Sequence, residues 1–139
     1  MIPMVSLQLS ALVASSAVGS PAGTLQVRVT GLASDRGAVR VALFDSEASF
    51  TRDARDAAVL EIQGGQARWT VRDLPPGRYA VAAFHDEDGD GDMDRGLFGI
   101  PREPYGFSRG ARGRFGAPSW DDASVRVGTG TTTTRVPVR

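Results

Sequence analysis

Short runs of alternating apolar and polar residues follow one another from Thr24 to the end of the chain, separated by turn-forming residues at intervals of roughly eight to twelve positions. Strict alternation of this kind is typical of β-strands that bury one face. It predicts seven strands, at residues 25–30, 39–44, 59–62, 67–71, 77–84, 123–127 and 132–138. Many short strands joined by turns indicate an all-β fold, here an antiparallel β-sandwich of about seven strands and immunoglobulin-like or transthyretin-like type.

Several details of the sandwich follow from the same pattern. We expect residues 25–30 and 39–44 to pair as an antiparallel hairpin. Residues 46–58 carry no strand pattern and would form a short helix, capped by Ser46 or Ser49, or an irregular crossover. Pro137 cannot donate to a β-ladder, so the last strand should lie at a sheet edge.

The strand at 77–84 leads into an acidic loop. After His85, Asp occupies loop positions one, three, five, seven and nine, and Gly91 occupies position six, as in the calcium loop D-x-[DN]-x-[DN]-G. Alternate carboxylates converge on one cation, and the glycine turns the chain so that a backbone carbonyl can join them. The pattern predicts a Ca²⁺ site. Its expected ligands are Asp86, Asp88, Asp90, the carbonyl of Asp92, and Asp94 directly or through water.

The loop also departs from an EF-hand. Position twelve, where an EF-hand has a bidentate Glu, is Leu97, and the upstream residues 75–77 (PPG) exclude a long helix. We therefore expect a calcium site between a strand and a loop. Its missing ligand would be Glu103, Asp121, Asp122 or water. The alternative is a solvated surface turn that binds no metal.

A long irregular loop follows, at residues 95–120, and loops of this length in compact domains are usually functional or disordered. It combines arginines with aromatic residues that need packing partners. One interpretation is internal, with the arginines balancing the aspartates and the aromatics packed. The other is external, a surface for a glycan, an anionic polymer or a protein partner such as an envelope protein. The residues of that possible ligand surface are Arg109, Arg112, Arg114, Tyr105 and Trp120.

The first residues differ from the rest. Residues 1–23 carry no charged side chain, and an apolar stretch at 5–18 ends in small residues suited to signal cleavage. The stretch is too short to span a membrane. We expect a signal peptide at 1–22, a single domain at 23–139, and a periplasmic or secreted protein. The alternative is a cytosolic protein with a disordered or strand-forming N-terminus, and the absence of Lys and Arg before the apolar stretch favours it.

Composition narrows the chemistry. A formal net charge of zero argues against nucleic acid as a partner, and the absence of cysteine excludes disulfides and thiolate metal sites. His85 is the one histidine, and it could be combined with Ser108 or Ser119 into a Ser/His/Asp set. Glu103 and Asp121 could likewise form a catalytic carboxylate pair. No sequence motif supports either arrangement. We expect a monomer that is not an enzyme.

Two resemblances accompany these motifs. Residues 73–81 (DLPPGRYAV) are similar to a turn and strand of transthyretin-like and carboxypeptidase-regulatory-like domains. The acidic loop together with 98–101 (FGIP), 105–108 (YGFS) and 113–119 (GRFGAPS) resembles a family of small exported bacterial proteins, domain of unknown function 2141, over residues 24–139. This resemblance implies a signal peptide, a β-sandwich and an Asp/Asn-Gly loop, and no known activity. Family members often carry Asn where this loop has Asp.

Overall fold

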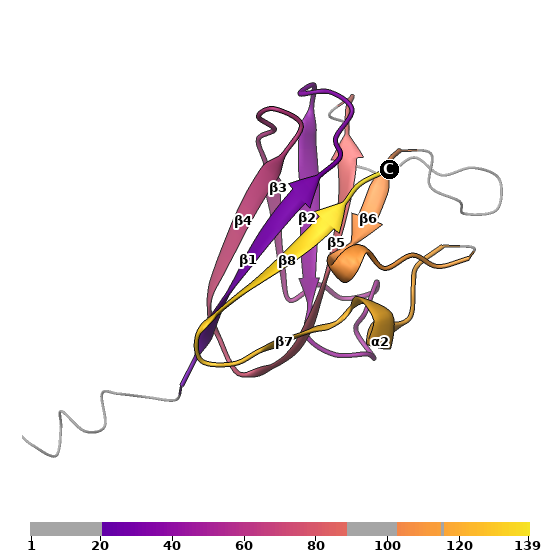
Figure 1. Cartoon of the computed structure of the whole chain (residues 1–139). Helices are drawn as coiled ribbons and strands as arrows, with labels where there is room; N and C mark the ends of the chain where they lie inside the picture. Colours follow the sequence, from indigo (N-terminus) through magenta and orange to yellow (C-terminus); the bar gives the residue numbers. More distant parts are fainter. Residues whose placement is uncertain (1–20, 89–102, 115) are drawn as a thin grey trace, which may run out of the picture.

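The computed structural model describes residues 21–88, 103–114 and 116–139, and in these residues the strands form two packed sheets (Figure 1). The strands are β1 (Gly23–Thr30), β2 (Ala38–Phe44), β3 (Asp56–Leu60), β4 (Ala67–Leu74), β5 (Gly77–Asp86), β6 (Tyr105–Phe107), β7 (Val125–Val127) and β8 (Thr131–Pro137). Two short helical segments are η1 (Ser108–Gly110) and α2 (Trp120–Ala123). In the described part of the chain no helix is long and apolar enough to cross a membrane.

One sheet has three strands in the order β4-β1-β8, and the other has five, β3-β2-β5-β6 with β7 paired to the start of β5. The predicted all-β sandwich is confirmed, and so is the edge position of the strand that contains Pro137. All pairs are antiparallel except β1 with β8, which run parallel. The immunoglobulin-like or transthyretin-like type stays a prediction.

The expected hairpin of residues 25–30 and 39–44 is wrong. β1 pairs with β4 and β8, whereas β2 pairs with β3 and β5 in the other sheet. Alternation tells which face of a strand is buried, but both sheets bury their inner faces against each other, so the pattern fits either sheet equally well.

The main core lies between the two sheets. The inward residues of β1 and β5, such as Leu25, Val27 and Val81, are almost completely buried there. A fully buried Val or Leu side chain contributes about 1.5–3 kcal/mol relative to an exposed one, so this layer supplies most of the apolar stabilisation.

A second, smaller core covers the outer face of the five-stranded sheet. Phe50 lies at its centre, in edge-to-face contact with Phe44, Phe107 and Trp120 at centroid distances of 5.6, 5.9 and 5.7 Å. Ala80 of β5 is also fully buried in this cluster. β5 is therefore covered on both faces. The second layer comes from the β2–β3 crossover, which carries Phe50, and from the segment after β6, which carries Trp120 (Figure 1).

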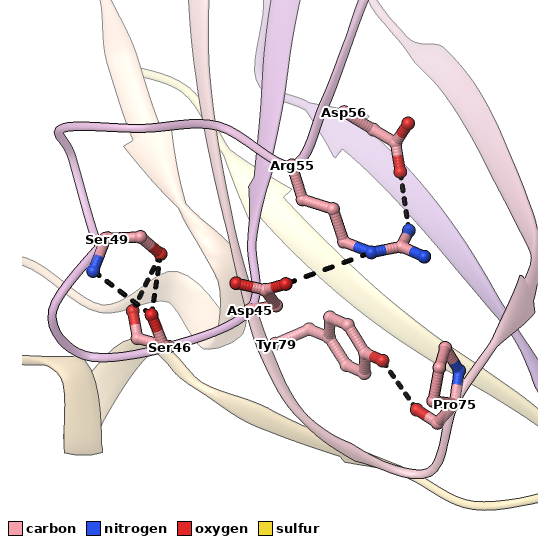
Figure 2. A network of polar contacts seen from close by, with 7 residues as sticks. All are labelled: Asp45, Ser46, Ser49, Arg55, Asp56, Pro75 and Tyr79. Carbon is pink, nitrogen blue, oxygen red and sulfur yellow. Dashed lines mark hydrogen bonds and ion pairs between the residues drawn. The ribbon is translucent and has the colours of Figure 1, made fainter.

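The crossover from β2 to β3 is irregular, which settles one of the two alternatives for residues 46–58. Turns replace a helix, and three hydrogen bonds join Ser46 to Ser49 (Figure 2). The Ser46 hydroxyl donates to the Ser49 hydroxyl at 2.9 Å and accepts from the Ser49 N–H, and the Ser49 hydroxyl donates to the Ser46 carbonyl. Arg55 closes the crossover through ion pairs to Asp56 at 2.7 Å and to Asp45 at 3.9 Å. Because the turn ends early, the next strand begins at Asp56 and not at residue 59.

Tyr79 fixes the corner between β4 and β5. Its ring is buried in the main core, and its hydroxyl donates to the carbonyl of Pro75 four residues earlier (Figure 2). Burial raises the pKa of Tyr79; nearby Arg55 lowers it and Asp45 raises it to a lesser degree. The corner starts β5 in a fixed position, and β5 carries the acidic residues at its other end.

Candidate metal centre

Three carboxylates converge where β5 ends. Asp86 is the last residue of β5, Asp88 follows in the loop, and Glu103 lies on the chain that returns towards β6. One oxygen from each lies within 4.8 Å of the other two. Asp86 is buried, Asp88 exposed and Glu103 half-buried, so the group opens to solvent on one side.

Asp86 is the most constrained member of the group. It is 0% exposed, and its Oδ2 accepts from Nε of Arg40 on the neighbouring strand β2 at 2.8 Å. A buried carboxylate needs such partners because desolvation of the charge costs several kcal/mol. The ion pair therefore sets the position of the Asp86 carboxylate before any cation binds.

His85 ties three segments together beneath this group. Its side chain is fully buried, and Nε2 donates to the carbonyl of Arg36 at 2.7 Å. Its backbone N–H donates to the carbonyl of Pro104 at 2.9 Å. Through these bonds β5 holds both the turn before β2 and the returning chain beside Glu103, which agrees with a role for His85 in orienting the loop.

Strand pairing and one side-chain hydrogen bond bring Glu103 to the site. β6 pairs with β5 so that Tyr105 lies opposite Phe84, and the Glu87 N–H donates to Oε2 of Glu103 at 3.3 Å. Strand pairing thus carries Glu103 to the end of β5, although fifteen residues or more separate it from Asp86 and Asp88 in the sequence.

The other two acids considered for the missing ligand lie elsewhere. Asp121 accepts from Arg78 at 3.1 Å, near the start of β5. Eight residues of extended strand separate Arg78 from Asp86, a span of roughly 26 Å. Asp122 is the next residue in the short helix α2. Of the three candidates, only Glu103 joins Asp86 and Asp88.

Gly37 lies directly against the site from the β1–β2 connection. Its φ is +70°, and a Cβ at this position would come within 2.1 Å of the Asp86 carbonyl oxygen and 2.8 Å of the Glu87 Cα. Only glycine fits this approach. Nothing in the sequence pattern indicates that the connection containing Gly37 packs against the start of the acidic loop.

The remaining predicted metal ligands, Asp90, Asp92 and Asp94, lie outside the described residues. The described residues therefore contain Asp86 and Asp88 from that prediction, and they add Glu103, which the loop spacing left as one of several options.

Most of the residues proposed as a ligand surface make internal contacts. Trp120 is 7% exposed and packs in the second core, so its ring offers little to a ligand. Arg112 stacks on Tyr105 at 4.6 Å from the ring centroid and donates to two backbone carbonyls. Arg109 donates to the carbonyls of Asp121 and Ser124. Arg114 is exposed.

The two serines of the hypothetical Ser/His/Asp set are engaged in structural contacts. Ser108 is buried, accepts from the Val81 N–H at 2.9 Å and donates to the carbonyl of Ala123. Ser119 caps α2 by accepting from the Asp122 N–H at 3.1 Å. Ser108 therefore connects β5 to the segment after η1.

The donor set of the carboxylate group consists of oxygen atoms only, which suits a hard cation such as Ca²⁺ or Mg²⁺ and not a soft metal. One carboxylate is fixed by burial, one reaches from the loop, and one arrives from a distant segment. This arrangement could hold a metal ion and would couple the loop to the sheet when it does.

Comparison with known proteins places the whole domain. No curated protein and no solved structure matches the chain. One family model matches residues 27–135, which include every described strand wholly or in part, and its description is an uncharacterised protein conserved in bacteria. The resemblance expected from the motifs is thereby confirmed, and the chain belongs to the DUF2141 family.

Proposed function

We propose that this chain is an exported, non-catalytic β-sandwich module that binds one calcium ion, and that the ion orders the segment at 95–120. The observation that carries the proposal is the convergence of three carboxylates within 4.8 Å at the end of β5. The ligands would be Asp86, Asp88 and Glu103, with Asp90, the carbonyl of Asp92, and Asp94 from the loop.

Calcium fits this donor set better than magnesium. Ca²⁺ accepts six to eight oxygen ligands in flexible geometry, whereas Mg²⁺ requires a near-ideal octahedron and retains several waters. A loop with an aspartate at every second position, joined by Glu103 from another segment, supplies many carboxylates with unequal spacing. The Gly at loop position six supports the same choice.

The ion would act mainly as a structural bridge. Ionised carboxylates at this separation repel one another, and a cation between them replaces repulsion with attraction. Because Glu103 comes just before β6, the ion would join the end of β5 to the chain that leads into the second core. The aromatic residues of that core would then be held against the outer face of the sheet.

A weak affinity of the site for calcium is consistent with export of the protein. Free calcium is abundant outside the cytosol, and calcium sites in extracellular modules typically have dissociation constants of about 0.1–1 mM. A site of that strength would be filled in the periplasm or outside the cell.

Thermal unfolding in excess EGTA and in 10 mM calcium, with magnesium as the control cation, tests the proposal. Calcium at about ten to one hundred times the dissociation constant adds roughly 1.4–2.7 kcal/mol to the free energy of unfolding. For a domain of this size the midpoint should rise by about 5–10 °C. An equal rise with magnesium, or no rise, would contradict a calcium site.

Matched variants locate the effect. In Glu103→Gln the calcium-dependent rise should disappear or fall to about half or less, because the substitution removes a charged ligand and keeps its shape. In Asp122→Asn the rise should persist, because that acid lies beyond the opposite end of β5. If both variants respond to calcium alike, Glu103 is not a ligand and the proposed site is wrong.

A further inference from the structure

The outer face of the three-stranded sheet carries a row of arginines. Arg28 of β1 lies opposite Arg68 of β4 on one side and opposite Arg135 of β8 on the other. All three side chains are exposed, since the alternate residues of these strands face the core. With neighbouring strands about 4.8 Å apart, three positive charges lie side by side across the sheet.

This row works against stability. Like charges placed directly opposite each other on neighbouring strands destabilise a sheet. None of the three arginines forms an ion pair with a described residue. Charged side chains on edge strands protect against aggregation, which would account for Arg68 and Arg135. Arg28 lies on the central strand, so edge protection does not explain it.

The row continues into a longer basic track. Three hollows lie along this track. The first, of about 160 Å³, is lined by Arg28 and Arg68, and the second, of about 520 Å³, by Arg28, Arg109 and Arg135. The third, of about 640 Å³, is lined by Arg109, Arg135 and further arginines of β5 and β7. Each hollow shares arginines with the next, and neither Asp nor Glu lines any of the three. In Figure 1 this sheet lies in front of the five-stranded one.

A second row lies beside the arginines. Gln26 is opposite Thr70 of β4 and Thr133 of β8, two residues along each strand from the arginine row. Their Cα atoms lie about 7 Å along the strands from those of the arginine row, and their side chains offer hydroxyl and amide groups. The face therefore combines a line of guanidinium groups with a line of neutral hydrogen-bonding groups.

From this surface we infer that the outer face of the β4-β1-β8 sheet binds a linear acidic polysaccharide. Guanidinium groups bind carboxylates and sulfates in bidentate fashion, and the Thr and Gln row suits sugar hydroxyls. A membrane surface fits less well, because Val59 of β3, in the other sheet, is the one large apolar side chain exposed in the described residues. Single-stranded nucleic acid fits less well, because Trp69, the one aromatic residue that lines the three hollows, is half-buried against the main core and the face offers no exposed ring for base stacking.

This site is separate from the calcium centre and from most of the residues expected to bind ligands in the 95–120 segment, with Arg109 alone in common. The test therefore uses the purified protein in EGTA, which removes calcium from both the protein and the polysaccharide. Fluorescein-labelled heparin and alginate oligosaccharides are titrated at low ionic strength, with a dextran oligosaccharide as the neutral control.

Both acidic oligosaccharides should bind, with an affinity that falls as salt is added, and dextran should not. The double variant Arg28→Gln/Arg135→Gln should bind on the order of tenfold more weakly or worse. The charge-matched control Arg36→Gln/Arg52→Gln, with both arginines exposed and outside the three hollows, should change the affinity by less than about twofold.

A folding readout separates binding from damage. The melting temperature of the Arg28→Gln/Arg135→Gln variant should equal or exceed that of the wild type, because the like-charge contacts are relieved. Absence of binding at low salt, equal weakening in the two double variants, or a lower melting temperature in the first would overturn the inference. So would tighter binding to phosphatidylglycerol vesicles or to single-stranded DNA than to either acidic oligosaccharide.

Discussion

Replacement of Arg40 by Gln tests how the sheet prepares the carboxylate group. Arg40 donates from Nε to the buried Asp86 carboxylate at 2.8 Å, and its own side chain is 36% exposed. Removal of one partner from a fully buried ion pair costs about 3–5 kcal/mol, whereas exposed pairs are worth about 0–1 kcal/mol. For this intermediate case we expect Arg40→Gln to lower the free energy of unfolding in EGTA by about 1–3 kcal/mol.

The loss should shift the melting temperature by about 4–12 °C for a domain of this size. Arg52→Gln is the matched control, because Arg52 is an exposed arginine in the β2–β3 crossover and forms no ion pair with a described residue. Circular dichroism during heating in EGTA measures both variants. If they melt within about a degree of each other, the Arg40–Asp86 pair does not hold the site.

The same variant predicts a change in the calcium response. Arg40 competes with a cation for the Asp86 carboxylate, so its removal should strengthen calcium binding and increase the calcium-induced rise in melting temperature above that of the wild type. A smaller rise in Arg40→Gln than in the wild type would refute this competition, because it would mean that the loss of the carboxylate position set by Arg40 outweighs the release of Asp86 for the ion.

Two further predictions concern Gly37, which lies against the site, and Tyr79, at the opposite end of β5. Gly37→Ala should lower the free energy of unfolding by at least about 2 kcal/mol, because its φ is +70° and the new Cβ would lie 2.1 Å from the Asp86 carbonyl oxygen. Gly64→Ala is the control, because Gly64 has a similar φ of +62° but no atom within 4 Å of the new Cβ. It should lower the free energy of unfolding by about 1 kcal/mol, and chemical denaturation measures both variants. Tyr79→Phe should cost about 1 kcal/mol at neutral pH. Burial raises the pKa of Tyr79 above its ordinary value, so the folded state holds the phenol proton more tightly than the unfolded state does. The resulting contribution to stability is complete below about pH 10 and is lost as the pH rises through the raised pKa. If the stability of the wild type is no more sensitive to that rise in pH than the stability of Tyr79→Phe, this reasoning is wrong.

Most strands were predictable from the sequence, but β6 lies in residues expected to form an irregular loop, and the strand partners were not predictable. Alternation in residues 25–30 correctly identified a half-buried strand, since one face of β1 lies in the main core. Its partners are β4 and the parallel strand β8, which come from distant parts of the chain. Local patterns contain the periodicity of a strand and almost nothing about which distant strand completes the sheet.

The sequence contains a signal for the second core in residues 80–84. Residues 80–84 (AVAAF) form a continuous apolar run, which is typical of a strand covered on both faces. The aromatic residues of the long loop indicated only that they need packing partners. Together these two observations would have predicted that Phe107 and Trp120 pack on the outer face of β5, as the structure shows.

In the metal centre too, local features were predictable from the sequence and contacts between distant segments were not. The loop spacing identified Asp86 and Asp88, because ligand spacing in a calcium loop is a local property. Glu103 could not be separated from Asp121 and Asp122 by spacing, because the pairing of β6 with β5 determines which acid returns to the site.

Equilibrium dialysis against radiolabelled calcium tests the central claim most directly. The account predicts one bound calcium per chain with a dissociation constant of about 0.1–1 mM, retained in Asp122→Asn and lost or weakened at least about tenfold in Glu103→Gln. No saturable binding by the wild-type protein up to 10 mM calcium, or equal binding by the two variants, would contradict a calcium site formed by Asp86, Asp88 and Glu103.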